Sequence, residues 1–151
     1  MDALAICQGL GLAIAAGLII GAVVPPIMPT WGVVAGAAPL GILACGAALN
    51  GEDEALWPAL PVGLLGAGLA ATVSRDVTGG AARRQRGSPG DPGIQAPTGV
   101  TAIVVVCAVI VAAVSLVAPP FSLLVLLALA WLALSRRRRE ERKHEGLRVL
   151  R

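Results

Sequence analysis

Five long apolar runs, separated by short stretches rich in proline or charge, dominate the pattern of hydrophobic and polar positions along the chain. The runs span residues 3–24, 31–49, 55–73, 100–118 and 119–135. Most of them approach the roughly 20 apolar residues that a helix needs to cross about 30 Å of hydrocarbon. A spanning segment must satisfy its own backbone groups, so each run is predicted to be a helix. The sequence therefore predicts an all-α bundle of about five transmembrane helices.

Prolines divide these runs and break some of them. Pro25 ends the first run, because proline lacks the backbone N–H that continues a helix. Pro39 predicts a kink within the second run. Pro61 bends or delays the third, which therefore either spans the bilayer or enters and leaves it on one side. Pro119 and Pro120 predict a hairpin turn, because one continuous helix through the last two runs would be about 50 Å long.

Composition supports a membrane location. Hydrophobic residues make up 56% of the 151 residues and charged residues only 14%, whereas soluble domains average about 45–50% and 25%. All 12 Lys and Arg lie in residues 74–97 or in residues 136–151. The predicted organisation is a transmembrane domain over residues 1–135, interrupted by a basic cytoplasmic loop at 74–97 and followed by a basic cytoplasmic tail at 136–151.

The charge pattern also predicts an orientation. Basic segments flanking short loops stay on the cytoplasmic side, and five crossings place both basic segments there. The acidic turn from Glu52 to Glu54 and the N-terminus then lie outside. The first run lacks the basic start of a signal peptide, so it is expected to be a retained helix. We expect a multi-pass protein of a bacterial inner (plasma) membrane, since the Ala/Gly/Arg/Pro bias suits a GC-rich bacterial genome.

Small residues recur every fourth position along two of the runs. The first set is Gly9, Ala13, Gly17 and Gly21, and the second is Ala55, Ala59, Gly63, Ala67 and Ala71. Gly32 and Gly36 form a shorter piece in the second run, while Leu18 is expected to face lipid. Such spacing lets helix backbones approach closely, although 19 glycines also produce it by chance. Two long sets favour true interfaces, either within the chain or between copies in a homo-oligomer.

Few residues could carry chemistry. The clearest polar residues within the runs are Gln8, Thr72 and Ser115, none of which ionises, and this argues against an ion-coupled pump. Arg75 and Asp76 follow the third run, and together with Gln8 they form the one candidate polar site. Catalytic, cofactor and metal residues are predicted to be none, so the chain is not expected to be an enzyme.

Cysteine and histidine do not change that prediction. Cys7, Cys45 and Cys107 lie far apart in apolar runs, so they are expected to be small buried residues and not a disulfide or zinc set. His144, the one histidine, lies in the charged tail, where a solvated side chain is expected.

Four consecutive arginines follow the fifth run: Arg136, Arg137, Arg138 and Arg139. Arginines directly behind an apolar helix act as a stop and attract anionic lipid headgroups, at about 1 kcal/mol each near the surface. Nucleic-acid binding is not expected, because no aromatic residues or folded module accompany the run. The predicted partners are therefore the lipid bilayer and its anionic headgroups.

The opening sequence from Asp2 to Leu18 and the closing sequence from Gly146 to Arg151 resemble the ends of uncharacterised bacterial multi-pass membrane proteins, grouped as a domain of unknown function. Such relatives often place a polar residue where Ile19 stands here. The resemblance implies membrane topology and no mechanism. The predicted function is a non-enzymatic, self-associating scaffold or interaction protein, and the alternative is a small transporter or channel subunit.

Overall fold

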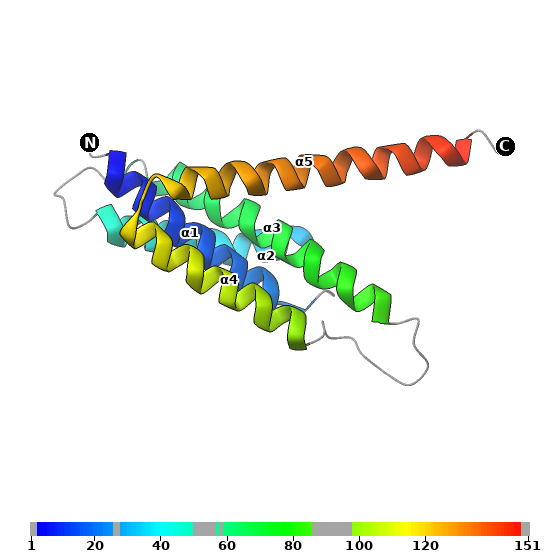
Figure 1. Ribbon diagram of the computed structural model, residues 1–151, viewed down its shortest axis with the longest axis horizontal. Coiled ribbons are helices and arrows are strands. Elements are labelled where there is room, and N and C mark those ends of the chain that lie inside the picture. The colour runs from blue at the N-terminus through cyan, green and yellow to red at the C-terminus, as the bar shows by residue number, and fades with distance from the viewer. Residues whose placement is uncertain (1–2, 26–27, 50–56, 58, 86–97, 149–151) are drawn as a thin grey trace.

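Helices make up nearly all of the described part of the chain, which contains no strand. The computed structural model describes residues 3–25, 28–49, 57, 59–85 and 98–148. Its five helices are α1 (Ala3–Val23), α2 (Thr30–Leu49), α3 (Ala59–Gln85), α4 (Thr98–Val117) and α5 (Phe121–Arg148) (Figure 1). The prediction of an all-α bundle is thus confirmed for these residues. The side chains of residues 59, 83–85, 98, 137 and 139–148 are not described.

Three of these helices are long and apolar enough to cross a membrane: α1, α2 and the Gly99–Val117 part of α4. The other two have shorter apolar parts. The apolar part of α3 runs from Ala59 to Ser74, about 24 Å of helix, before Arg75 and Asp76 interrupt it. In α5 the apolar part is Phe121–Arg136, and the rest of the helix is charged.

The third helix differs most from the sequence prediction. A loop is expected from Ser74, yet α3 continues to Gln85. Ser74, Thr78 and Ala82 are buried at four-residue spacing and form one continuous face of the helix. The Thr78 hydroxyl also donates to the carbonyl of Ser74, at 3.1 Å. Gly79 and Gly80 lie within this helix, so packing of the buried face outweighs the weak helix propensity of glycine.

Other boundaries shift less. The fifth run is expected to start at Pro119, whereas α5 begins at Phe121 and both prolines lie in the preceding turn. The amide of Ser122 donates to the carbonyl of Pro119 at 3.1 Å, which closes the first turn of the helix. At the other end α5 continues through the arginines to Arg148. The acidic turn from Glu52 to Glu54 and position Ala55 lie outside the described residues.

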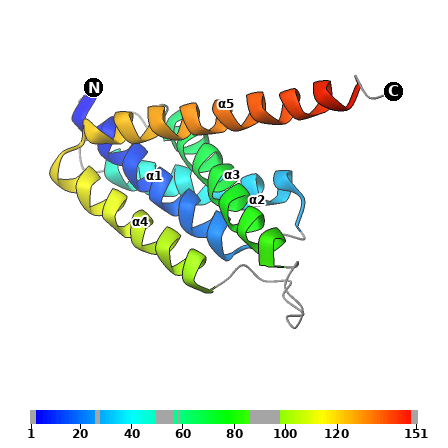
Figure 2. The ribbon, with the colours of Figure 1, turned by 45° about the vertical axis from the view of Figure 1, so that its right-hand side comes forward.

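Helix α1 is the centre of the bundle. It contacts all four other helices, as α3 also does, whereas α2 contacts only α1 and α3 among the described elements. Figures 1 and 2 show α1 between α4 on one side and α2 with α3 on the other, while α5 crosses the bundle and projects beyond it. The start of α1 and the α4–α5 turn lie at one end, and the C-terminal end of α3 lies at the other.

The core follows from this arrangement. Leu10, Ile14 and Leu18 of α1 pack with Ala70 of α3 and Ala108 of α4. The expectation that Leu18 faces lipid is wrong, because this side chain is only 8% exposed. A helix with neighbours on several sides has little free surface, so even the face beside the glycine set is covered. Smaller clusters join α1 to α2 and α2 to α3.

Candidate functional site

The small residues of α1 lie against the backbones of α2 and α3. A methyl group placed on Gly9 would lie 3.2 Å from the Cα of Cys45 in α2, and one on Gly17 would lie 2.8 Å from the Cα of Ala67 in α3. One on Gly21 would collide with the carbonyl of Ala71 in α3. Ala13, the remaining member of the set, is fully buried. At these positions any side chain would force the helices apart.

Helices α2 and α3 meet at a pair of glycines. A methyl group on Gly63 would lie 2.7 Å from the carbonyl oxygen of Gly41, and one on Gly41 would lie 2.6 Å from the carbonyl oxygen of Gly63. Ala67 and Ala71 extend the α3 side of this contact and are fully buried. Gly41 lies between Ala37 and Cys45 at four-residue spacing, and all three are buried, but this set was not among those predicted from the sequence. The side chain of Ala59 is not described.

A third small-residue contact joins α1, α4 and α5. A methyl group on Gly11 would lie 2.7 Å from the hydroxyl oxygen of Ser115 in α4 and 3.3 Å from the Cβ of Ser122 in α5. Both serines are almost fully buried. Gly11 lies two residues from Gly9, which places it on the opposite face of the helix. Sequence reasoning missed Gly11 and Ser122, because it searched for repeats at a spacing of four.

Gly32 and Gly36 of α2, the shorter small-residue piece predicted on the second run, do not lie against another helix. A methyl group on Gly36 would meet no other part of the described chain within 4 Å, and one on Gly32 would meet only Pro29 at 3.8 Å. Both glycines therefore lie on the outer face of α2. Of the two alternatives left open for this piece, a contact within the chain is not found among the described residues, and a contact between copies stays a prediction.

The candidate polar site is not assembled in the described structure. Gln8 lies in the second turn of α1, whereas Arg75 donates to the carbonyl of Met28, beyond the opposite end of that helix. From Gln8 to the end of α1 is about 22 Å, so the two side chains serve different ends of the bundle. Asp76 follows Arg75 in α3 and is exposed.

Hydroxyl groups in the bundle are engaged by backbone carbonyls. Ser74 of α3 donates to the carbonyl of Leu18 in α1 at 2.9 Å, and this bond is buried and joins two helices. Five others donate within their own helices or the adjoining turn, namely Thr72 to Leu69, Thr78 to Ser74 and Arg75, Ser115 to Ala112, Ser122 to Pro119 and Ser135 to Leu132. These hydroxyls serve structure, and they form no set that could perform acid–base or nucleophilic chemistry.

The described residues also form no site for a metal ion or for chemistry at a cysteine thiol. No group of three His, Cys, Asp or Glu residues converges there. Cys45 is buried, Cys7 is half-buried and Cys107 is exposed on α4. The expectation of three buried cysteines is therefore wrong for Cys107, because α4 turns that face away from α1.

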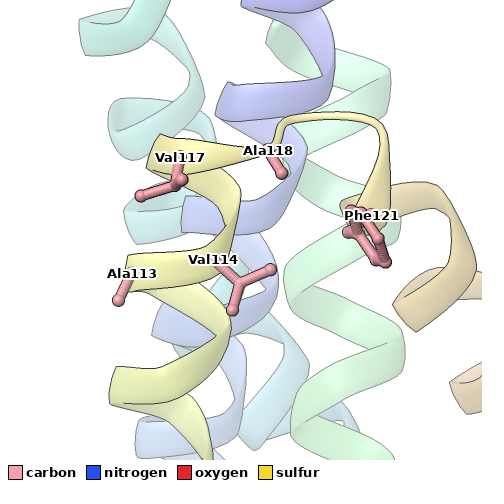
Figure 3. A pocket seen from close by; sticks show the side chains of 5 residues that line it. All are labelled: Ala113, Val114, Val117, Ala118 and Phe121. Atoms are coloured by element: carbon pink, nitrogen blue, oxygen red, sulfur yellow. The ribbon is translucent and has the colours of Figure 1, made fainter.

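An open apolar groove lies at the α4–α5 turn. It has a volume of about 570 Å³ and is lined by Ala113, Val114, Val117, Ala118 and Phe121. Figure 3 shows these side chains along the last turns of α4 and around the turn into α5. The lining exposes only apolar surface, so the groove can accommodate apolar groups.

The arginines that follow the apolar part of α5 lie on its projecting half (Figure 2). Arg138 is exposed and Arg136 is half-buried, while the side chains of Arg137 and Arg139 are outside the described set. The resulting positive charge lies next to an exposed apolar stripe that includes Trp131 and Leu134. An apolar surface that ends in cations is suited to the boundary between hydrocarbon and headgroups.

Comparison with known protein families, with curated proteins and with solved structures finds no match to this chain.

Proposed function

We propose that the protein is a non-enzymatic membrane scaffold or interaction protein that associates with further copies of itself. The observation that carries the proposal is a contrast between polar and apolar groups. Buried hydroxyls such as Ser74 and Ser115 donate to backbone carbonyls, while α2, α4 and α5 leave large apolar side chains exposed. A chain of this kind is built to contact lipid and other helices, not to process a substrate.

The outer face of α4 supports the membrane part of the proposal. Ile103, Val106 and Ile110 are 65%, 57% and 55% exposed. Residues that face α1, such as Ala108 and Ser115, are buried. In water a contiguous apolar face of this size promotes aggregation, whereas in a bilayer it contacts lipid tails at no such cost. We infer that this face of α4 lies in hydrocarbon.

Five crossings of the inner membrane are the topology that we propose. The short apolar parts of α3 and α5 can cross if their arginines extend toward the headgroups. Trp31, Trp57 and Trp131 are each more than 70% exposed. Trp31 lies in the first turn of α2, whereas Trp57 follows α2 in the chain and precedes α3. The two tryptophans therefore flank opposite ends of α2 in the sequence. Tryptophans at both ends fit the aromatic belts of a membrane protein.

The orientation follows from charge. The end of α3 and the arginine-rich half of α5 lie away from the end at which α1 begins (Figure 1), and Arg75 donates to the carbonyl of Met28, beyond the other end of α1. Positive residues are retained on the cytoplasmic side. We therefore propose a cytoplasmic C-terminus, an external N-terminus and contact of Arg136 and Arg138 with anionic headgroups.

Counting copies in a bilayer tests the proposed function directly. The full chain with one fluorophore is reconstituted at high dilution into vesicles of neutral and anionic phospholipids, and bleaching steps are counted in single vesicles. We expect two or more steps where vesicle number far exceeds protein number. Single steps throughout would overturn self-association. Solute flux through the same vesicles, above that of empty ones, would instead favour a transporter or channel subunit.

A further inference from the structure

We propose that α3, α4 and α5 thin the lipid bilayer at the end of the bundle where α1 begins. The partner is the phospholipid of that leaflet, whose headgroups lie beside the α4–α5 turn and not level with the start of α1. The hydrocarbon is then about 24 Å thick beside these three helices and about 30 Å thick beside α1 and α2. This inference deepens the proposed function and rests on its five membrane crossings.

The contacts between α1 and α3 fix their relative heights along the bundle. Gly17 lies against Ala67 and Gly21 lies against Ala71. The offset is 50 residues in both pairs, so the two helices run side by side in the same direction. Ala59, where α3 begins, is therefore about six residues, or about 9 Å, farther along the bundle than the start of α1.

Helices α4 and α5 stop short of the start of α1 by a similar amount. Gly11 of α1 lies against Ser115 of α4 and Ser122 of α5. Because α4 ends just after this contact and α5 begins just before it, the turn between them is also about 9–10 Å from the start of α1. Helix α2 reaches farther, since Gly9 lies against Cys45 and α2 continues for one more turn. This end of the bundle is therefore stepped.

The opposite end of the apolar region has no such step. Arg75 of α3 donates to the carbonyl of Met28, in the turn after α1, so charge begins in α3 at the height where α1 ends. In α4 the polar residues Thr98 and Thr101 precede an apolar stretch that begins at Ala102. The apolar stretches of the three helices are about 24 Å long and span residues 59–74, 102–117 and 121–136.

Extended basic side chains do not close the gap at the stepped end. A hydrophobic surface shorter than the surrounding hydrocarbon is matched by extended flanking residues, by association or by thinning of the bilayer. All 12 Lys and Arg lie in residues 74–97 or 136–151, which follow the apolar stretches of α3 and α5. The gap at the start of these helices therefore has no cation beside it.

The α4–α5 turn gives an independent reason for headgroups and water at this height. Pro119 and Pro120 have no N–H to donate to the carbonyls of Ser115 and Leu116, four residues earlier. The amides after the prolines donate within the turn itself, so these two carbonyls have no backbone donor among the described residues. In hydrocarbon such carbonyls are costly, and thinning brings water to them. Gln8, a half-buried amide of α1, lies at nearly the same height.

Two exposed residues at one height provide a matched test. Leu43 of α2 is 67% exposed and Phe121 of α5 is 54% exposed, and the contacts of Gly9 and Gly11 place them within about one residue of the same height. Leu43→Cys and Phe121→Cys are made in the full chain with its native cysteines replaced by alanine. Each is labelled with bimane in a phosphatidylcholine bilayer whose hydrocarbon is about 30 Å thick, and depth is measured by quenching with lipids spin-labelled along their chains.

The label at 121 should lie about 6–9 Å nearer to the headgroups than the label at 43. The control pair is Trp31→Cys and Ile103→Cys, which are exposed and share one height near the other end; these labels should lie at equal depth. Equal depths for 43 and 121 would overturn thinning and leave the membrane crossings intact. A control pair separated as much as the test pair would indicate a tilted bundle and also overturn it. If no lipid quenches either test label, the chain is outside the bilayer and the proposed function fails too.

The unmodified chain allows a second measurement without any substitution. Trp57 precedes α3 and Trp131 lies in α5, and both are exposed. Brominated phosphatidylcholine quenches them, and unbrominated lipids of different chain length compete for the same surface. Lipids that form about 24 Å of hydrocarbon should compete about twofold or more better than lipids that form about 30 Å. Equal competition, or a preference for the longer lipids, would contradict the inference.

Discussion

The contact between Gly17 of α1 and α3 is the sharpest test of how this bundle is held together. The perturbation is a single methyl group, Gly17→Ala. That methyl would lie 2.8 Å from the Cα of Ala67 and 2.9 Å from its carbonyl carbon. The atoms in the way belong to backbone, so a rotamer change cannot relieve the overlap and one helix must move away from the other.

Two opposing effects decide the magnitude. Replacing glycine by alanine inside a helix stabilises it by roughly 0.5–1 kcal/mol, and overpacking a tight contact costs about 1–3 kcal/mol. Gly68→Ala isolates the first effect, because its methyl would lie 3.7 Å from the Val34 side chain, an ordinary contact. The helix effect cancels between the two variants. Gly17→Ala should therefore be about 1–3 kcal/mol less stable than Gly68→Ala.

Thermal unfolding in a mild detergent measures this difference. At about 2–4 °C per kcal/mol for a chain of this size, the Tm of Gly17→Ala should lie about 2–12 °C below that of Gly68→Ala. Both variants should reach the membrane in equal amount, since neither changes the hydrophobicity of its segment appreciably. Equal Tm values, or a higher one for Gly17→Ala, would refute the argument that close backbone contact stabilises the bundle.

Three further predictions concern a hydrogen bond, the topology and the tail. Ser74→Ala removes the bond to the Leu18 carbonyl and should lower the free energy of unfolding by about 0.6 kcal/mol, up to about 1.7. The control is Ser135→Ala, because the bond of Ser135 stays within α5. Equal losses of stability in the two variants would contradict the interpretation that the Ser74 bond holds two helices together. Cysteines introduced one at a time at 53, 83 and 148 should react with an impermeant reagent in intact cells only at position 53; labelling at position 83 would exclude five crossings. Replacing residues 136–139 with glutamine should reduce preference for anionic over neutral lipid, and an unchanged preference would remove these arginines from headgroup binding.

The number and approximate positions of the helices could be predicted from the sequence, because long apolar runs bounded by prolines are a strong local signal. The end of α3 could not. Its continuation through Gly79 and Gly80 depends on the buried face of Ser74, Thr78 and Ala82, and Ser74 bonds to Leu18, which lies 56 residues earlier in the sequence. Leu18 was misplaced for the same reason, since the exposure of a residue on an apolar helix depends on how many neighbours the helix has.

The sequence predicts that each small-residue set forms one narrow stripe along its helix. The geometry of the helix explains why the set on α1 contacts two different helices. Residues four apart advance by about 40° around a helix of 3.6 residues per turn. Three such steps from Gly9 to Gly21 therefore turn the set by about 120°. This rotation matches the change of partner, from Cys45 of α2 at Gly9 to Ala67 and Ala71 of α3 at Gly17 and Gly21.

The same geometry accounts for the central place of α1. Gly11 lies about 200° around the helix from Gly9, on the side that meets Ser115 of α4 and Ser122 of α5. Glycines on opposed sides allow close neighbours on both, which a one-sided stripe does not. Helix α2 has Gly41 against α3 and Gly36 on its outer face, the same opposed arrangement with one side unoccupied in the described chain.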